Sequence, residues 1–191
     1  MSIINATMYE DLEWDSPDRF YPSYIPVLKH EPLKRHFIIL ESPEPINKGV
    51  VSKISFNTGD LVAQCTGFVL KFQTLHSLQH TNGIYYCDEF FAGYLLHSCD
   101  PNCRLDMNDF TLHAIKDIRP FDKVTIDYEA TEDHLYNTFN CNCGSANCKG
   151  LIEGKRTRIL KAVKDVSIVA VKEDANFNSF KLKEEVFEEK E

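Results

Sequence analysis

The chain has 191 residues and a mass of 22.0 kDa, which is enough for one domain with a buried core and too little for two ordinary domains joined by a linker. Hydrophobic residues make up 43% of the chain, and glycine and proline contribute only 8 residues each, so disordered and fibrous proteins are excluded. The net charge of −8 argues against direct nucleic-acid binding and favours cationic partners.

The seven cysteines do not form the evenly spread pairs of a secreted disulfide scaffold, because their number is odd and three of them crowd into residues 141–148. Residues 1–15 carry acidic side chains and no basic segment followed by an apolar run, so we expect no signal peptide. The longest apolar runs are too short to span a membrane. We therefore expect an intracellular protein, cytoplasmic or nuclear, without membrane partners, in which clustered cysteines bind metal.

The predicted elements begin with residues 1–34, where four prolines between aromatic residues interrupt any helix, so we predict an extended N-terminal arm that packs through its aromatics. Short strands separated by turn residues are predicted at residues 36–40, 49–54, 61–66, 68–72, 84–87, 110–114 and 123–128. Residues 73–82 are expected to form a loop or a short helix, and residues 89–96 a helical turn. Many short strands and little helix predict a mostly-β domain.

The C-terminal part divides into two segments of different composition. Residues 131–152 are polar and rich in cysteine. Residues 153–191 are predicted to be a C-terminal extension with a basic patch, a strand at residues 166–171 and a charged end at residues 181–191. We expect that end to be helical or frayed, because a solvated terminus is the commoner case.

A compact cysteine motif occurs in the sequence Cys141-Asn-Cys143-Gly-Ser-Ala-Asn-Cys148. Two thiolates one residue apart, and a third after a link that contains glycine, can aim their sulfurs at one point about 2.3 Å away, the usual Zn–S distance. Tetrahedral zinc needs a fourth ligand, which the neighbouring sequence does not supply. The alternative is that these are ordinary thiols close together by chance, but the spacing is unusual for a core.

A second polar segment is His97-Ser-Cys99-Asp-Pro101-Asn102. Pro101 sets a tight bend, and polar side chains beside such a bend usually hold backbone or ligand in place. A Cys–His pair also permits a nucleophilic cysteine. Residues so close along the chain seldom converge on one reacting atom, so we favour the positioning role.

These segments, in this order and at this separation, resemble the SET-domain protein methyltransferases, whose post-SET segment carries a similar cysteine run. The resemblance also covers Asn47-Lys-Gly-Val-Val51 near the start of the domain. It further covers Val124-Thr-Ile-Asp-Tyr128, a strand-like run that ends in Asp-Tyr. In all, the resemblance spans residues 35–152.

The resemblance implies a SET-type fold of small β-sheets threaded by a pseudoknot, with few short helices and a post-SET zinc knuckle. It divides the chain into a SET domain at residues 35–130 and a post-SET zinc segment at residues 131–152. The implied zinc ligands are Cys99, Cys141, Cys143 and Cys148. The zinc would be structural, since four thiolates leave no open position. The implied activity is methyl transfer from S-adenosylmethionine to a lysine side chain of a basic protein or peptide, such as a histone.

The same resemblance assigns roles to residues of an active site. Tyr128 would be catalytic, with its hydroxyl near the transferred methyl group and the attacking nitrogen. The implied cofactor-binding residues are Lys48, Gly49, Val50, Tyr94, Leu96, His97 and Phe139. The implied substrate channel is lined by Tyr86, Phe121 and Tyr136. Taken singly, each of these aromatics is more often a core residue than a channel residue, and Tyr128 could merely end a strand. His97 could orient its loop through a backbone hydrogen bond, or it could be a buried structural histidine.

Two positions depart from the family pattern. Leu96 replaces the asparagine before the histidine and cannot supply the hydrogen bonds that help hold the cofactor, and the glycine pair of the first cofactor-binding turn is reduced to Gly49. The segment at residues 68–83 is also short, which reduces one wall of the peptide groove. Two alternatives to protein-lysine methylation therefore stay open: a SET-fold methyltransferase for a free amine, amino acid or other small molecule, and a catalytically weak SET-fold module that binds a peptide.

Overall fold

The computed structural model describes residues 13–41 and 48–162. Predictions that fall outside these ranges concern residues 1–12, Asn47, residues 166–171 and residues 181–191. As far as Thr157, the described chain forms one compact unit, which holds every predicted site residue. No helix in the described ranges is long and apolar enough to cross a membrane.

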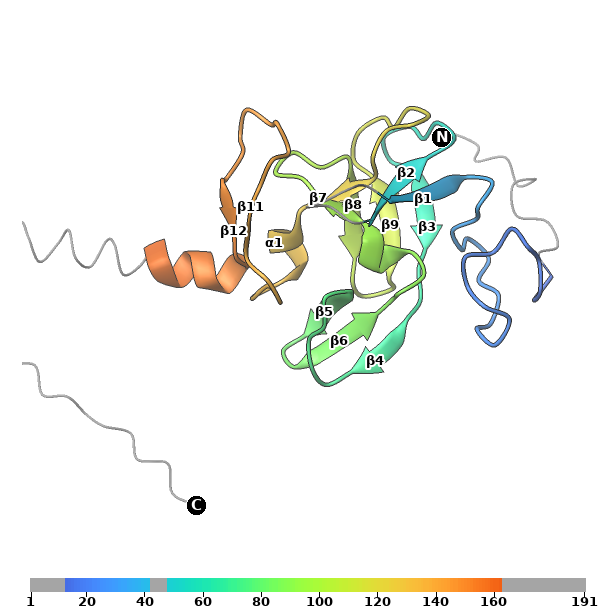
Figure 1. Ribbon diagram of the computed structural model, residues 1–191, viewed down its shortest axis with the longest axis horizontal. Coiled ribbons are helices and arrows are strands. Elements are labelled where there is room, and N and C mark those ends of the chain that lie inside the picture. Colours follow the sequence, from blue (N-terminus) through green and yellow to red (C-terminus); the bar gives the residue numbers. More distant parts are fainter. Residues whose placement is uncertain (1–12, 42–47, 163–191) are drawn as a thin grey trace, which may run out of the picture. The chain divides into compact units, whose positions relative to one another are not determined.

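The strands of this unit gather into small sheets (Figure 1). One three-stranded sheet has the order β3-β9-β8, formed by Leu61–Gln64, Thr111–Ala114 and Cys103–Asp106. Another has the order β4-β6-β5, formed by Phe68–Leu70, Ile84–Cys87 and Ser77–Thr81. The two-stranded sheets pair β1 (Phe37–Glu41) with β2 (Lys48–Ser52), β7 (Leu96–His97) with β10 (Thr125–Ile126), and β11 (Phe139–Asn140) with β12 (Leu151–Ile152). β7 and β10 are parallel, whereas the other two-stranded sheets are antiparallel.

Helix is scarce in the described ranges. The 3-10 turn η2 covers Ala92–Tyr94, the short helix α1 covers Tyr128–Thr131, and a further helix begins at Lys155. Small, mostly antiparallel sheets with short helices confirm the predicted mostly-β class. The threaded crossing of the chain stays a prediction.

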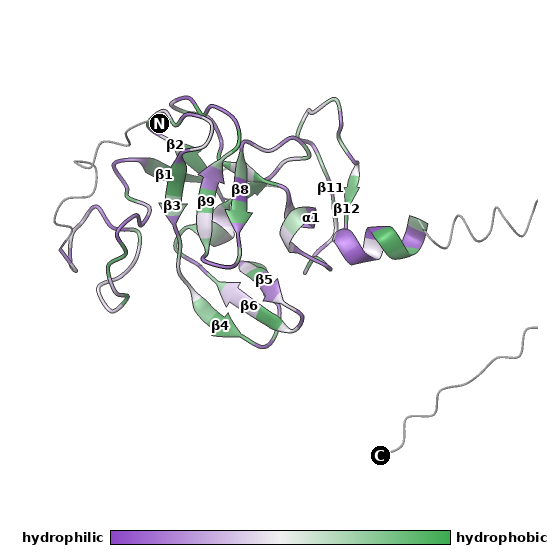
Figure 2. Ribbon diagram, turned by 180° about the vertical axis from the view of Figure 1, so that it is seen from behind, coloured by the Kyte–Doolittle hydropathy of each residue, from purple (hydrophilic) through white to green (hydrophobic). Residues whose placement is uncertain are grey.

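Alternation along the central strands explains why they form a sheet. In β8, Cys103 and Leu105 are buried while the residues that follow each of them are more exposed, so one face of the strand points into the core. On the paired strand β9, Leu112 is fully buried. The rings of Phe37 and Phe56 stack in the same core with their centroids 5.7 Å apart. Figure 2 shows hydrophobic residues over much of β1 and β3.

Residues 13–34 pack on the core as a series of turns rather than as an extended arm. The predicted packing through aromatics holds for Phe20, whose ring centroid lies 5.5 Å from that of Phe91. A buried ion pair joins Arg19 Nε to Glu31 Oε1 at 2.7 Å, and the guanidinium also donates to backbone carbonyl oxygens. Such pairing allows both charges to be buried, and it draws the turns together.

The structure corrects three local predictions. Residues 77–81 form strand β5 rather than a loop or a helix, and residues 103–106 form strand β8, which the sequence analysis does not predict. The strand predicted at residues 123–128 is limited to β10, and Tyr128 begins α1 instead of ending a strand. The reason is local, because Asp127 caps the helix through a hydrogen bond that its side chain accepts from the Glu129 N–H.

Candidate functional site

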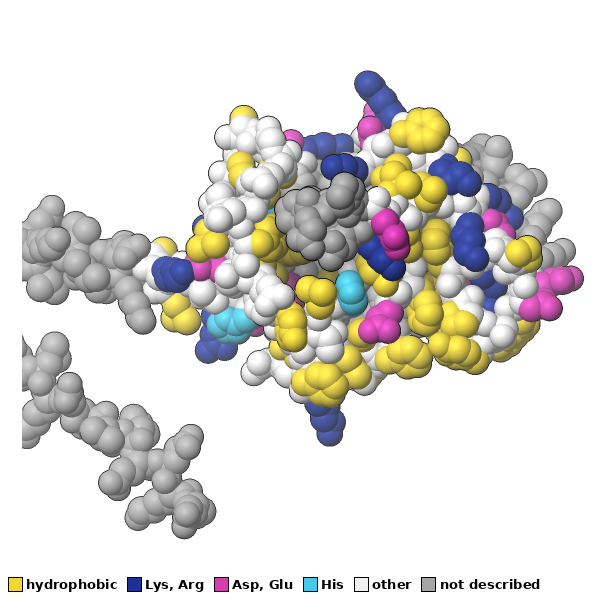
Figure 3. Space-filling model, in the orientation of Figure 1, with side chains coloured by type: hydrophobic (Ala, Val, Ile, Leu, Met, Phe, Trp, Pro, Cys, Tyr) yellow, Lys and Arg dark blue, Asp and Glu magenta, His cyan; other side chains and the backbone are white. Residues whose placement is uncertain are grey.

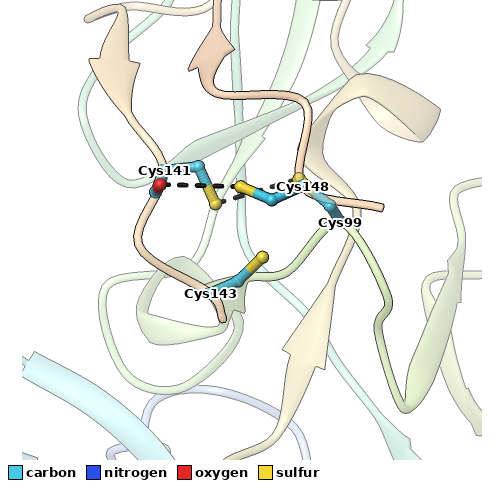
Figure 4. Close-up of side chains that lie close together, drawn as sticks. All are labelled: Cys99, Cys141, Cys143 and Cys148. Carbon is cyan, nitrogen blue, oxygen red and sulfur yellow. Dashed lines mark hydrogen bonds between the residues drawn. The ribbon is translucent and has the colours of Figure 1, made fainter. Parts of the chain in front are cut away.

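Four cysteines from two separate parts of the sequence form one cluster, which we call the cysteine cluster: Cys99, Cys141, Cys143 and Cys148. Their sulfur atoms all lie within 4.8 Å of one another, and Figure 4 shows the side chains converging from opposite segments. The Sγ atoms of Cys99 and Cys141 are 3.8 Å apart. These separations fit four thiolates around a tetrahedral zinc ion, so the cluster could hold a structural zinc with no open coordination position.

The local backbone explains how three of these sulfurs meet. They lie on the link between β11 and β12, where the Cys141 N–H donates to the Gly150 carbonyl oxygen at 2.8 Å. Gly144 and Gly150 adopt positive φ values of 74° and 72°, which L side chains rarely adopt, and so the link can turn sharply. Cys99 comes from the loop after β7, and the backbone N–H of Lys149 donates to its sulfur at 3.3 Å. Hydrogen bonds therefore hold the link and the loop together independently of a bound metal.

The thiols of the cluster differ in acidity. Backbone hydrogen bonds, first from Cys99 and then from Ser145, lower the pKa of Cys143 to about 6. Burial raises the pKa of Cys141 to about 12. A bound cation would favour the thiolate form of every member, since only thiolates are metal ligands.

Tyr128 lies beside the cysteine cluster in a group of rings. Its hydroxyl donates to the Leu95 carbonyl oxygen at 2.6 Å. Its ring centroid lies 5.2 Å from that of His97 and 6.1 Å from that of Phe139. Burial, and then the charge of Glu132, raise the pKa of Tyr128 to about 12, so the phenol is neutral at physiological pH.

His97 connects Tyr128 to the cysteine cluster. Its side chain is 2% exposed, and burial lowers its pKa, so the imidazole is neutral at physiological pH. The Nδ1 atom accepts a hydrogen bond from the Tyr128 N–H at 3.2 Å, which leaves the ring proton on Nε2. Nε2 lies 3.4 Å from Cys99 Sγ. His97 is thus both buried and engaged in orienting the backbone, and it combines the two alternatives left open by its sequence.

Most of the predicted cofactor-binding residues lie near this group. Lys48 Nζ lies 5.4 Å from the centroid of the Tyr94 ring, as in a cation–π contact. Gly49 packs against Leu96 so closely that a Cβ atom at residue 49 would lie 2.7 Å from Leu96 Cδ1. The side chain of Val50 is fully buried in β2, so only its backbone could contact a ligand.

The residues predicted to line the channel are more scattered. The Tyr86 ring stacks on Phe110 at 5.1 Å between centroids and tilts against His80 at 5.2 Å. Phe121 is 80% exposed and adopts a positive φ of 72°, and Tyr136 is 56% exposed. Within the described ranges, no ring contact joins any of these three to Tyr128. Their role in a channel stays a prediction.

Two charged residues near Tyr128 were not among the predicted site residues. Lys149 forms ion pairs with Asp127 at 2.8 Å and with Glu129 at 3.0 Å, and so ties the cysteine-rich link to α1. Glu132 is buried at the end of α1, and burial raises its pKa to about 7. Its signal in the sequence is its position four residues after Tyr128, which becomes informative once Tyr128 is known to begin a helix.

Strand β4 and the short segment between β4 and β5 carry exposed hydrophobic side chains. Figure 3 shows hydrophobic side chains at the β4 end of the molecule. The residues concerned are Phe68, Val69, Phe72 and Leu75, each at least 51% exposed. This surface is therefore apolar and solvent-facing, and its role as a wall of a peptide groove stays a prediction.

Comparisons with known proteins identify a family and several relatives. The SET-domain family model matches residues 30–129, more than half of the chain. Methyltransferase flvH of Aspergillus flavus is 42% identical over 66 residues, which are 33% of this chain and 36% of flvH. Histone-lysine N-methyltransferase ASHR3 of Arabidopsis thaliana is 29% identical over 132 residues, which are 56% of this chain and 26% of ASHR3. The chain thus spans only about a third of flvH and about a quarter of ASHR3.

A similar solved structure is the methyltransferase domain of the human histone-lysine N-methyltransferase SETMAR. It is 21% identical in sequence to this chain. The match covers 62% of this chain and 58% of the SETMAR chain, with a TM-score of 0.49.

Proposed function

The chain belongs to the SET-domain family, and from this premise we propose that it is an S-adenosylmethionine-dependent methyltransferase whose acceptor is a lysine side-chain amine of a basic protein, such as a histone. The observation that carries the proposal is the grouping of Tyr128, His97 and Phe139 beside the cysteine cluster. The names of flvH and ASHR3 support methyl transfer, and that of ASHR3 supports the lysine acceptor. A histone acceptor would place the protein in the nucleus.

The residues around Gly49 fit the chemistry of the proposed cofactor. S-adenosylmethionine carries a carboxylate, a sulfonium and an aromatic base. Lys48 offers a cation for the carboxylate, and the rings of Tyr94 and Phe139 offer faces for the sulfonium or the base. Gly49 itself is needed for close packing against Leu96, because a Cβ atom at residue 49 would lie 2.7 Å from Leu96 Cδ1.

Tyr128 is proposed to position the amine rather than to remove its proton. Methyl transfer moves positive charge from sulfur to nitrogen, so the reaction needs alignment and oxygen lone pairs more than a strong base. The Tyr128 hydroxyl donates to the Leu95 carbonyl oxygen, which leaves its own lone pairs free to face a substrate. Its pKa of about 12 keeps it protonated and in this orientation.

The cysteine cluster is proposed to bind structural zinc and to brace the site. Cys99 follows β7, which carries His97, and the other ligands belong to the link next to Phe139. A metal joining them would fix the spacing between the two segments that supply rings to the Tyr128 group. Zinc with four sulfur ligands has no position for water and takes no part in the chemistry.

A second candidate function is favoured by Leu96, which cannot replace the amide of the family asparagine. A SET-fold module with weak cofactor binding would hold a peptide without methylating it. Calorimetric titration with S-adenosylmethionine separates the two candidates, because a transferase must show saturable binding at one site per chain. Absence of any binding to the folded, metal-loaded chain would exclude the transferase.

Replacement of Tyr128 by phenylalanine tests the assigned role. Removal of one catalytic polar group typically lowers turnover by about 10²- to 10³-fold, and we expect a loss of this size in Tyr128→Phe, with S-adenosylmethionine affinity changed by less than about twofold. Tyr24→Phe is the matched control, because Tyr24 is 67% exposed and lies outside the site. Turnover by Tyr128→Phe equal to that of the control would remove Tyr128 from the mechanism.

A further inference from the structure

Glu132 is a buried carboxylate without a cationic partner in the described ranges. The residue is 4% exposed. Its Oε1 accepts a hydrogen bond from the Gln79 N–H at 2.7 Å, and its Oε2 accepts one from Gln73 Nε2 at 3.2 Å. Both donors are neutral amides. Buried charges are normally paired with an opposite charge, so this site lacks the partner that an ionised Glu132 requires.

The position of Glu132 relates it directly to Tyr128. The two residues are one helical turn apart, and the Glu132 N–H donates to the Tyr128 carbonyl oxygen at 2.8 Å. Residues four apart on a helical turn lie on the same face. The negative charge of Glu132 also raises the pKa of Tyr128, because it disfavours the phenolate. Both side chains therefore face one low-dielectric region.

We propose that the missing partner of Glu132 is the ammonium group of the substrate, and that Glu132 selects a cationic amine and accepts its proton before methyl transfer. This inference rests on the proposed function and deepens it. In the proton step, one N–H bond of the ammonium breaks and an O–H bond forms on the Glu132 carboxylate. The electron pair stays on nitrogen and makes the amine nucleophilic, and the proton leaves to solvent after the product departs.

The acidity of Glu132 suits a proton acceptor at physiological pH, because a general base works best when its pKa lies near the working pH. Its pKa of about 7 results mainly from burial and is raised further by the charge of Asp133. The other groups that act on this carboxyl are uncharged: hydrogen bonds from the Gln79 backbone, the Thr131 side chain and the Gln73 side chain lower its pKa. The Lys155 N–H donates to the backbone carbonyl oxygen of Glu132 and not to its carboxylate. An incoming ammonium would shift this balance toward the carboxylate.

A purely structural role for Glu132 is the competing explanation, since residues 132 and 133 both form hydrogen bonds with Gln79 of β5. Gln79 also exchanges hydrogen bonds with Asp133, at 2.8 Å to the Asp133 N–H and 3.1 Å to its Oδ2. Asp133 is only partly buried, so its charge is solvated and needs no substrate partner. Asp133→Asn therefore removes one charge from the same set of hydrogen bonds to Gln79 and serves as a matched control for Glu132→Gln.

The first test measures amine binding by nuclear magnetic resonance of glutamate carboxyl carbons in the full, metal-loaded chain. The probes are Nα-acetyl-lysine amide and its uncharged analogue Nα-acetyl-norleucine amide. We expect one carboxyl resonance to titrate near pH 7, to disappear in Glu132→Gln, and to shift its midpoint to lower pH with the charged probe but not with the neutral one. A Glu132 resonance that responds equally to both probes, or to neither, would overturn the proposal.

The second test measures methyl transfer to a lysine peptide as a function of pH. We expect both the wild type and Asp133→Asn to show a rise in kcat/KM, with a midpoint near pH 7 in the wild type and at a lower pH in Asp133→Asn, which lacks the charge that raises the pKa of Glu132. Loss of general-base catalysis typically costs about 10²- to 10⁴-fold, so Glu132→Gln should lose at least about 10²-fold and the rise itself. A retained rise in Glu132→Gln would overturn the proposal.

A variant at Gln73 distinguishes loss of the Glu132 charge from simple misfolding. Glutamine at residue 132 would face the Gln73 amide donor, and Gln73→Ala removes that conflict while keeping the charge of Glu132. Gln73→Ala should keep the pH-dependent rise, and the double variant Gln73→Ala/Glu132→Gln should lose it. If the wild type methylates neither peptides nor amines, the proposed function fails, whereas the binding test with the two probes still decides the role of Glu132.

Discussion

The central sheet β3-β9-β8 and the cysteine-rich segment at residues 139–151 are stabilised in different ways. The sheet buries its apolar side chains, among them Leu112 at 0% exposure. In residues 139–151 no side chain is buried, and β11 and β12 are joined over only two residue pairs. The sheet is thus held by apolar burial, whereas the segment depends on its four thiols and the ion pairs of Lys149. Tyr128 lies where the two regions meet.

Metal removal should separate the two regions most strongly. We expect a chelator, or Cys99→Ser, to abolish methyl transfer and to release the cysteine-rich segment, while the sheet keeps its protection from hydrogen exchange. Hydrogen exchange of residues 139–151 and of β8 and β9, together with metal analysis, measures this. Cys87→Ser is the control, because that thiol lies outside the cluster. Full zinc occupancy in Cys99→Ser would remove Cys99 from the ligand set.

A cavity in the sheet should have the opposite effect, because it should destabilise the sheet and leave metal binding intact. Leu112→Ala removes a fully buried side chain and should lower the free energy of unfolding by about 3 to 4 kcal/mol. Below its unfolding temperature, the variant should still bind metal with wild-type stoichiometry. Denaturant unfolding checks the first result, and Val69→Ala, at a position 60% exposed, should change stability by less than about 0.5 kcal/mol. Loss of the metal in folded Leu112→Ala would show that the two regions are not separable.

Glu132, at the junction between the two regions, should make the free energy of unfolding depend on pH. Its folded pKa of about 7 is above the ordinary value of 4.5, so its favourable contribution is complete below 4.5 and is lost as the pH rises through 7. The unfolding free energy of the wild type minus that of Glu132→Gln should therefore fall with increasing pH, by at most about 3 kcal/mol. Denaturant unfolding from pH 5.5 to 8 avoids acid release of metal. A difference that is constant or rises with pH contradicts a raised pKa.

Loss of the Lys149 ion pairs should have the smallest effect on stability. Lys149→Met keeps the backbone N–H that donates to Cys99 and loses the contacts to Asp127 and Glu129. The Lys149 side chain is 32% exposed, but that of Glu129 is only 5% exposed, so we expect a cost of about 1 to 2 kcal/mol, seen as faster hydrogen exchange in residues 139–151. Lys116→Met, which loses an exposed ion pair to Asp100, is the control. Equal exchange in both variants would assign no bracing role to Lys149.

The sequence predicted the apolar strands and the cysteine motif because each has a local signature, namely alternation or fixed spacing. It did not predict β5, because Ser77–Thr81 is polar and is buried through hydrogen bonds from Gln79 to residues over fifty positions away. The helical start at Tyr128 depends on the cap at Asp127, which the apolar run before it obscured.

Within the site, the family resemblance named Tyr128, His97 and the four cysteines, and the structure brings these together. It did not name Glu132, whose burial follows from contacts with β5 rather than from any local pattern. Phe121 and Tyr136 match the expected channel only in being aromatic, and aromatic character does not indicate the direction of a side chain.

The most direct measurement of the central claim is mass spectrometry of lysine peptides and free amines incubated with the metal-loaded chain and S-adenosylmethionine carrying a deuterated methyl group. Our account predicts that the labelled methyl group appears on an amine nitrogen with the wild type and is strongly reduced with Tyr128→Phe. Undiminished labelling by Tyr128→Phe, or no labelled amine with a folded wild type that binds the cofactor, would contradict it.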